Sequence, residues 1–151
     1  MSQEIQKTIR RVALDLLARR EHAPKELLQK LLRHGFQPDD IQHALDQLTD
    51  QNLLSKDRFI ESYIAARRRK GFGPLHIQAE LSERGIESSE IENHLTLNAP
   101  EWLNEVKTVW AKRFKNQLPK DFKERAKHMR FLQSRGFTSE QIQFAIRSQD
   151  A

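Results

Sequence analysis

Apolar residues recur along this chain at the three- and four-residue spacing of amphipathic helices, with polar residues between them. No stretch alternates apolar and polar residues as a half-buried strand does, and no Asn-Gly hairpin turn occurs. Glycines mark the breaks between helices, and proline, serine or threonine stands where the next helix begins. We therefore expect an all-α protein.

One complete set of three short helices lies in residues 55–95. The first helix begins after Ser55 and ends in four consecutive cations. The second opens at Pro74, where proline is tolerated in a helix, and stops at Gly85. The third begins near Ser88. This stretch is the unit around which the rest of the chain is organised.

The same unit recurs on both sides of the central stretch. Gly35, Gly85 and Gly136 are 50 and 51 positions apart. Matching apolar residues stand four positions before and one, six and ten positions after these glycines: Leu31, Leu81 and Leu132; Phe36, Ile86 and Phe137; Ile41, Ile91 and Ile142; Leu45, Leu95 and Ile146. A fixed period near 50 indicates tandem helical repeats.

We divide the chain into three three-helix repeats, residues 1–54, 55–98 and 99–151, in an elongated, curved array. We interpret the three glycines as helix stops and nothing else. In the third repeat we expect the middle helix to start early, at Pro119. The spacing of Thr138 and Gln141 predicts a capping box at the start of the last helix.

Residues 57–86, DRFIESYIAARRRKGFGPLHIQAELSERGI, combine charged, aromatic, glycine and proline positions in an order that generic helices do not share. The distinctive positions are Asp57-Arg58-Phe59, Tyr63, Arg67, Lys70-Gly71, Gly73-Pro74, Ile77, Glu80-Leu81 and Arg84-Gly85-Ile86. This segment resembles the centre of the RecX family, bacterial regulators of the RecA recombinase that are built of three three-helix units. The resemblance weakens outward, and the third repeat, which has no Gly-x-Gly-Pro turn, departs most.

The resemblance implies a non-catalytic regulator whose partner is the RecA filament on DNA, with direct contact to single- or double-stranded DNA also open. It implies inhibition of RecA ATPase, strand exchange and coprotease activities, by limiting filament extension or promoting disassembly. It implies no cofactor, and a place in DNA recombination, DNA repair and the SOS response.

Charge is distributed unevenly along the chain. Of 151 residues, 37% are hydrophobic and 31% charged, with a formal net charge of +5. Positive and negative residues balance in the first two repeats, so the whole excess lies in residues 99–151. This favours a polyanion or an acidic protein face as the partner. The absence of cysteine, of a signal sequence and of an apolar run near 20 residues leads us to expect a cytoplasmic protein.

Sequence motifs for catalysis or metal binding are lacking. No pair of the six histidines has the helical spacing of a metal site, and we expect them to be solvated or half-buried. Residues 71–73 superficially suggest a phosphate-binding loop, but neither the preceding strand nor the following Gly-Lys-Ser/Thr is present. We therefore expect no enzyme, no metal and no cofactor.

Basic clusters are the candidate partner- or DNA-binding residues. The first choice is Arg67, Arg68, Arg69 and Lys70. A cation in the last turn of a helix interacts favourably with the partial negative charge there, by about 0.3–1 kcal/mol. This effect accounts for one or two cations at the helix end more readily than for four in a row. Because helical residues point about 100° apart, at least two should face solvent. The second choice, inferred from charge alone, is Lys112, Arg113, Lys115, Lys123, Lys127 and Arg130.

Two other functions stay open. Tryptophans among cations, as at Trp102 and Trp110, are found where proteins stack on bases, but their helical spacing with Val106 favours a core position. A direct DNA- or RNA-binding protein acting without RecA is the alternative, although acids on the third helices oppose a groove-reading helix. These acids are Asp39, Asp40, Asp46, Glu87, Glu90 and Glu92. An accessory subunit of an enzyme is the third possibility.

Overall fold

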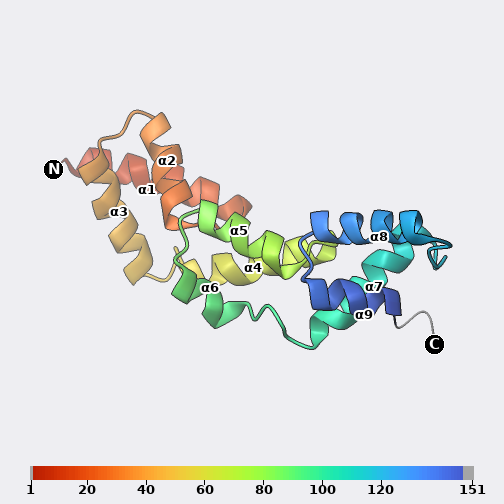
Figure 1. Ribbon diagram of the computed structural model, residues 1–151. Helices are drawn as coiled ribbons and strands as arrows, with labels where there is room; N and C mark the ends of the chain where they lie inside the picture. Colours follow the sequence, from red (N-terminus) through yellow and green to blue (C-terminus); the bar gives the residue numbers. More distant parts are fainter. Residues whose placement is uncertain (1, 148–151) are drawn as a thin grey trace. The chain divides into compact units, whose positions relative to one another are not determined.

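A computed structural model describes residues 2–147 of the chain, and within that range the secondary structure is nine helices and no strand. Figure 1 shows them in order along the chain. They are α1 (Gln3–Arg19), α2 (Pro24–Arg33), α3 (Pro38–Asp50), α4 (Lys56–Arg69), α5 (Pro74–Glu83), α6 (Ser88–His94), α7 (Glu101–Phe114), α8 (Phe122–Ser134) and α9 (Ser139–Arg147). The all-α prediction is confirmed.

Local sequence signals set most helix boundaries. Pro24, Pro38 and Pro74 are the first residues of their helices, where a missing backbone N–H costs nothing. After α2, α5 and α8 the chain turns at glycines in the left-handed conformation, with φ of 93° at Gly35 and 96° at Gly136. The predicted role of these glycines as helix stops is therefore confirmed.

The predicted early start of the middle helix in the third repeat is wrong. Helix α8 begins at Phe122, and Asp121 is its N-cap, because its side chain accepts a hydrogen bond from the backbone N–H of Glu124 at 2.8 Å. Lys115 and Asn116 hold left-handed backbone conformations after α7. Pro119 therefore lies in the connection and opens no helix.

The capping box at the start of α9 is present. The Thr138 hydroxyl accepts from the Gln141 backbone N–H at 3.2 Å, and the Gln141 side chain accepts from the Thr138 backbone N–H at 2.9 Å. Gln141 is buried and also donates to the Leu97 carbonyl at 2.7 Å. One side chain thus fixes both the start of α9 and the segment that precedes α7.

The repeated apolar positions form the core. In all three repeats the residues four before and six and ten after the glycine are buried, with Leu31, Leu81 and Leu132 fully inaccessible. The residues that directly follow the glycines are buried at Ile86 and Phe137 and half-buried at Phe36. The periodicity in the sequence therefore records burial rather than a surface motif.

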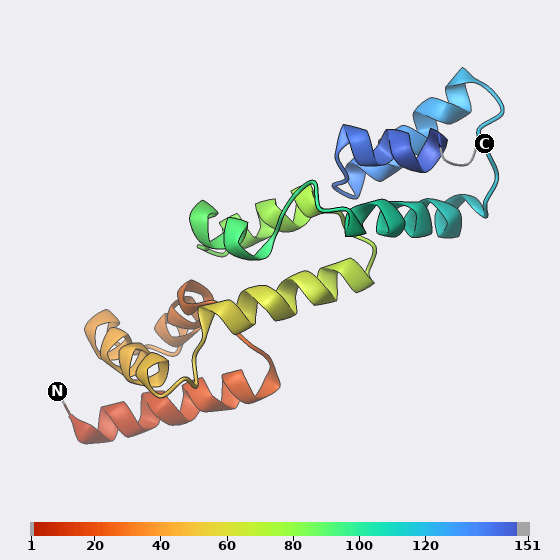
Figure 2. The ribbon, with the colours of Figure 1, turned by 90° about the horizontal axis from the view of Figure 1, so that it is seen from below.

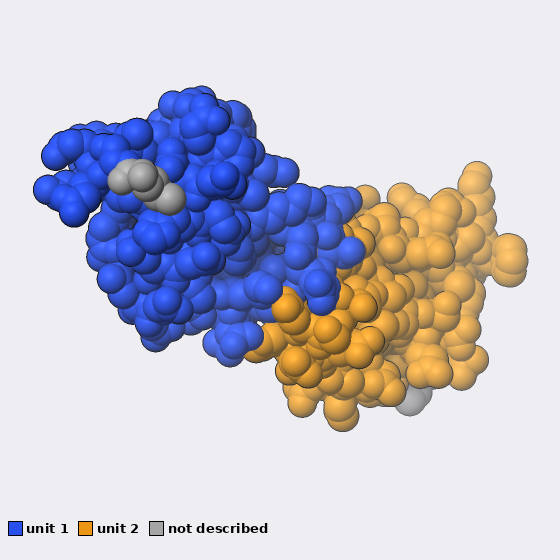
Figure 3. All heavy atoms as spheres, turned by 90° about the vertical axis from the view of Figure 1, so that its left-hand side faces the viewer, with its two compact units in different colours: residues 1–63, 82–87 blue, residues 64–81, 88–151 orange. Residues whose placement is uncertain are grey.

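The described chain falls into two compact units (Figure 3). Of the described residues, the first unit comprises 2–63 and 82–87, and the second comprises 64–81 and 88–147. In the first unit, α1, α2 and α3 pack against one another, as Figure 2 also shows. The core cluster to which these three helices contribute contains Ile9, Ala13, Leu27, Leu31, Ile41, Ala44, Leu45, Leu48 and Leu54.

In the second unit, α7 packs against α8 and α9, which also pack against each other. Trp102, Val106 and Trp110 are at most 2% exposed, so their predicted core position is confirmed. The Trp102 indole N–H donates to the Thr96 carbonyl at 3.1 Å. Buried aromatic side chains with satisfied N–H groups are typical of a folded core.

A backbone junction also holds the second unit together. The Gly73 N–H donates to the Arg135 carbonyl at 2.7 Å, and the Leu75 N–H donates to the Gly136 carbonyl at 2.9 Å. A Cβ atom on Gly73 would lie 2.6 Å from the Gly136 carbonyl carbon. These two glycines therefore permit a close backbone approach, which corrects the interpretation of Gly136 as a helix stop and nothing else.

Candidate partner-binding surface

The first two cations of the run at the end of α4 have partners inside the second unit. Arg67 donates through Nε to Glu80 Oε1 at 2.9 Å, and its guanidinium lies 4.0 Å from the centre of the Phe72 ring. Arg68 pairs with Glu105 through Nε at 2.8 Å and through a second nitrogen.

The Arg68 guanidinium also lies 4.6 Å from the Trp102 ring centre. The hydrogen bonding that Arg68 donates to Glu105 raises the pKa of Arg68 above its usual value, although burial opposes it. Arg67 and Arg68 therefore tie the end of α4 to α5 and α7, which is a structural task.

The other two cations of the run are exposed. Arg69 and Lys70 face solvent, and no side-chain hydrogen bond or ion pair joins them to the described residues. This is the division that a helix requires, since four successive residues cannot share one face. Arg69 and Lys70 are thus the members of the run that remain available to a partner.

Arg69 and Lys70 lie at the edge of a surface hollow of about 460 Å³ in the second unit, which we call the basic hollow. Its lining comes from the end of α4, from α7 and from the end of α8. The lining residues are Arg68, Arg69, Lys70, Gly71, Glu105, Thr108, Val109, Lys112, Arg113, Phe131 and Arg135. Six of them are cations, and Glu105 is the single carboxylate.

Two arginines lie close to the same aromatic ring in the basic hollow. The guanidinium groups of Arg113 and Arg135 lie 5.4 Å and 5.3 Å from the centre of the Phe131 ring. Arg135 also lies 5.0 Å from the Phe72 ring centre. Such contacts hold a guanidinium in place. Arg135 also donates through one Nη to the Lys70 backbone carbonyl at 3.5 Å.

The structure brings together only part of the second predicted set of cations. Lys112 and Arg113 line the basic hollow, whereas Lys115, Lys123, Lys127 and Arg130 do not. Their role in binding stays a prediction. Arg135 is a member of the hollow that sequence reasoning missed, because its neighbours there come from helices far apart in the sequence.

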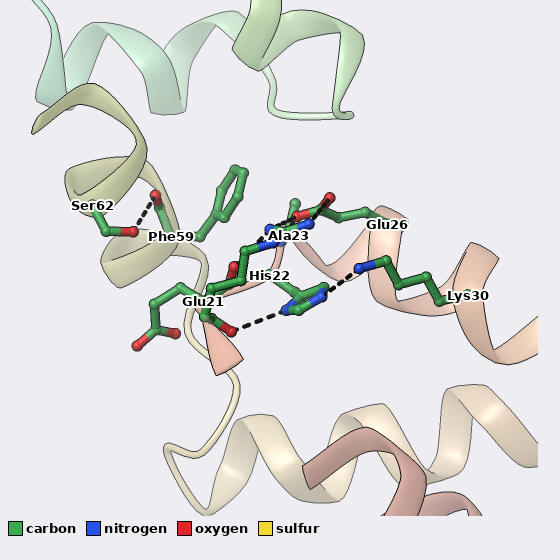
Figure 4. A network of polar contacts seen from close by, with 8 residues as sticks. Glu21, His22, Ala23, Glu26, Lys30, Phe59 and Ser62 are labelled. Atoms are coloured by element: carbon green, nitrogen blue, oxygen red, sulfur yellow. Dashed lines mark hydrogen bonds and ion pairs between the residues drawn. The ribbon is translucent and has the colours of Figure 1, made fainter. Parts of the chain in front are cut away.

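Two histidines depart from the expectation that all are solvated or half-buried. His22 is 1% exposed and His128 5% exposed. His22 Nδ1 lies 3.0 Å from the Arg20 carbonyl oxygen. Its Nε2 lies 2.8 Å from the Lys30 ammonium, a contact that Figure 4 shows. Since a carbonyl only accepts and an ammonium only donates, His22 is neutral with its proton on Nδ1.

His128, in the second unit, is also buried with a hydrogen-bonded ring nitrogen. Its Nδ1 accepts a hydrogen bond from the Trp110 indole N–H at 3.0 Å, and its ring stacks on Phe114 at 3.7 Å. Burial lowers the pKa of both imidazoles below the usual value. Sequence reasoning missed these positions because periodicity does not show which polar side chain has buried partners.

Metal-ligand geometry is absent from residues 2–147, in which no three or more His, Asp or Glu side chains converge as a metal site would require. Over the same residues, no helix has the length and apolar character needed to cross a membrane.

The fold places the chain among all-α proteins built of three-helix repeats, and comparison with known proteins specifies the family. Family models of the first, second and third three-helix domains of RecX match residues 10–48, 57–95 and 101–146. Relatives from Pseudomonas fluorescens (strain SBW25) and Pseudomonas tolaasii, both named Regulatory protein RecX, are 43% identical over 94% of this chain and 92% of theirs. The chain belongs to the RecX family of regulatory proteins.

Solved structures agree with this fold. The crystal structure of RecX from Lactobacillus salivarius matches with a TM-score of 0.83 over 99% of both chains at 22% identity. A second crystal structure, of a regulatory protein RecX, matches with a TM-score of 0.79 over 95% of this chain and 73% of that one, at 23% identity. The predicted family and the all-α three-helix repeats are confirmed, whereas the proposed boundaries after residues 54 and 98 stay predictions.

Proposed function

We propose that this chain binds the filament that RecA forms on DNA and lowers RecA activity, by limiting filament extension or promoting disassembly. Membership of the RecX family carries the proposal. Its relatives are named as regulatory proteins rather than by a reaction. The chain accordingly acts by binding, without catalysis and without a cofactor.

The basic hollow and the exposed cations beside it supply the contact surface in this proposal. Arg69 and Lys70 are exposed, and Lys112 stands on the same hollow. A chain of three repeats offers several contact surfaces to adjacent RecA subunits. Weak contacts made at once then add through effective concentration, so no single contact has to be strong.

The test measures RecA ATPase on single-stranded DNA and RecA strand exchange, with this chain at stoichiometries well below one per RecA subunit. Both activities should fall. If both stay unchanged when the chain is in excess, the proposal is wrong.

Paired substitutions then separate binding from structural cations. Replacing Arg69 and Lys70 by alanine should weaken inhibition several-fold while the helical circular dichroism stays unchanged, because both side chains are exposed. Replacing Arg67 and Arg68 by alanine should lower the melting temperature, because both hold ion pairs. Lys7→Ala with Arg11→Ala, exposed on α1, removes the same charge elsewhere and should leave inhibition near wild type.

A further inference from the structure

The side-chain nitrogen of Lys30, on α2, lies against a histidine rather than a carboxylate. Lys30 Nζ is 2.8 Å from His22 Nε2, as Figure 4 shows. Glu26, one turn earlier on α2, is held by Arg20 through two hydrogen bonds of 2.9 and 3.0 Å. No ion pair joins Lys30 to an acid among the described residues. Its ammonium form therefore lacks the partner that most often stabilises it.

The surroundings of Lys30 also disfavour its charged form. Burial has the largest effect and lowers the pKa of Lys30 below its usual value. Three arginines lower it further by their charge, against the opposing charge of Glu26: Arg20, Arg33 and Arg19. An amine is a nucleophile only without its proton, and desolvation next to other cations activates lysine in this way. Lys30 is half-buried, so its nitrogen is not sealed from solvent.

His22 is placed to accept a proton from the Lys30 nitrogen. The Arg20 carbonyl oxygen, 3.0 Å from Nδ1, fixes the proton of the neutral ring on that nitrogen. The lone pair of Nε2 is therefore available to Lys30 Nζ. His22 is 1% exposed, so bulk water hardly competes for this lone pair. The two side chains thus bring a nucleophile and a base within hydrogen-bonding distance, as nucleophilic catalysis requires.

The charge near this pair selects an anionic reagent. Arg33 and Arg19 are exposed, and neither forms an ion pair with the described residues. Guanidinium groups match the paired oxygens of a phosphate. An acyl phosphate combines such an anion with a reactive carbonyl, and its phosphate is a good leaving group.

We propose that Lys30 is a modification site that takes the acyl group of a small acyl phosphate, with His22 as the proton acceptor. The ammonium first releases one proton to solvent. The Nζ lone pair then bonds to the acyl carbon, and a second proton passes to His22 Nε2. The bond between the acyl carbon and the phosphate oxygen breaks, and the oxygen keeps the electron pair.

His22 then returns its proton to the departing phosphate. The products are an amide on Lys30, hydrogen phosphate and the one proton released to solvent. Because the amide is neutral, the reaction removes one positive charge from the first unit. It requires neither RecA nor DNA, so its failure leaves the proposed regulation of RecA standing.

The test treats the full chain with millimolar acetyl phosphate and follows the acetylation of each lysine by mass spectrometry of its peptides. Lys7, exposed on α1 of the same unit, is the reference. Lys30 should react about tenfold faster than Lys7, which is less than the roughly 100-fold or more that a positioned base contributes in enzymes. Equal rates at the two lysines would overturn the proposal, and this comparison needs no variant.

Two variants separate the base from the attraction of the phosphate. In His22→Gln the amide can still bond to Lys30 but cannot take its proton, so Lys30 should slow to the rate of Lys7 while the circular dichroism stays unchanged. Arg33→Gln should slow Lys30 several-fold with acetyl phosphate but not with uncharged N-acetylimidazole. An unchanged Lys30 rate in His22→Gln would overturn the role of His22. Faster reaction with acetyl-CoA than with acetyl phosphate at equal concentration would overturn the choice of donor.

Discussion

At the scale of single residues, Gly136 and Gly35 share a left-handed backbone but have different surroundings. Their φ angles are 96° and 93°. A Cβ atom on Gly136 would lie 2.4 Å from Cβ of His76 and 2.5 Å from its backbone nitrogen. No atom lies within 4 Å of the corresponding position on Gly35. Comparing substitutions at these two glycines therefore separates the cost of an unfavourable backbone conformation from the cost of close packing.

Substitution of each glycine by asparagine tests this difference. Asparagine tolerates the left-handed conformation, so Gly35→Asn should cost less than about 1 kcal/mol of unfolding free energy. Gly136→Asn should cost about 1–3 kcal/mol more, because its side chain would displace the start of α5. Urea unfolding measures both values. Equal losses would show that the contact with His76 contributes nothing.

Which glycine is crowded could not be read from the sequence. All three repeat glycines stand at the same place in their repeats, and the helix-stop role follows from that place alone. Crowding depends on a second segment, His76 for Gly136, that lies 60 positions away in the chain. Arg135 was missed as a member of the basic hollow for the same reason, since its partner Phe72 lies 63 positions away in the chain.

At the scale of helices, the start of α9 has two reciprocal hydrogen bonds between Thr138 and Gln141. Thr138→Ala should destabilise the second unit by about 1 kcal/mol, because one helical N–H then loses its acceptor. Thr108→Ala is the matched control. Thr108 is exposed within α7 and bonds only to the Asn104 carbonyl one turn earlier, so alanine there should be neutral or slightly stabilising.

Melting followed by tryptophan fluorescence reports on the second unit, which contains Trp102 and Trp110. The prediction is contradicted if the two alanine variants melt together. Helix starts at proline and the capping box were predictable because their signals lie within four residues of the boundary. The start of α8 was not, because the left-handed turn at Lys115 and Asn116 delays the helix until Asp121 can cap it.

At the scale of the whole molecule, three repeats in the sequence correspond to two compact units in space. The repeat pattern describes how each helix buries its apolar face. It does not show which helices that apolar face packs against. Helix α4, for example, contributes Lys56–Tyr63 to one unit and its remaining residues to the other. The basic hollow depends on this packing, since it needs the end of α4 beside α7 and α8.

Each compact unit contains one buried neutral histidine, His22 in the first and His128 in the second. Burial lowers the pKa of both. Below the ordinary histidine pKa of about 6.5 the unfolded chain therefore binds more protons than the folded chain. The stability that these side chains contribute is complete above that pH and is lost as the pH falls through their lowered folded values.

Urea unfolding at pH 7.5 and 5.5 should consequently show lower stability at pH 5.5. In the double variant His22→Gln with His128→Gln the difference between the two pH values should shrink, because glutamine stays neutral. Its amide can also donate to the Arg20 carbonyl at one site and accept from the Trp110 N–H at the other, so stability at pH 7.5 is largely kept. An unchanged difference between the two pH values would mean that other groups cause the acid sensitivity. The single variants His22→Gln and His128→Gln separate the two units. If only one of them reduces the pH difference, the acid sensitivity belongs to the unit that contains that histidine.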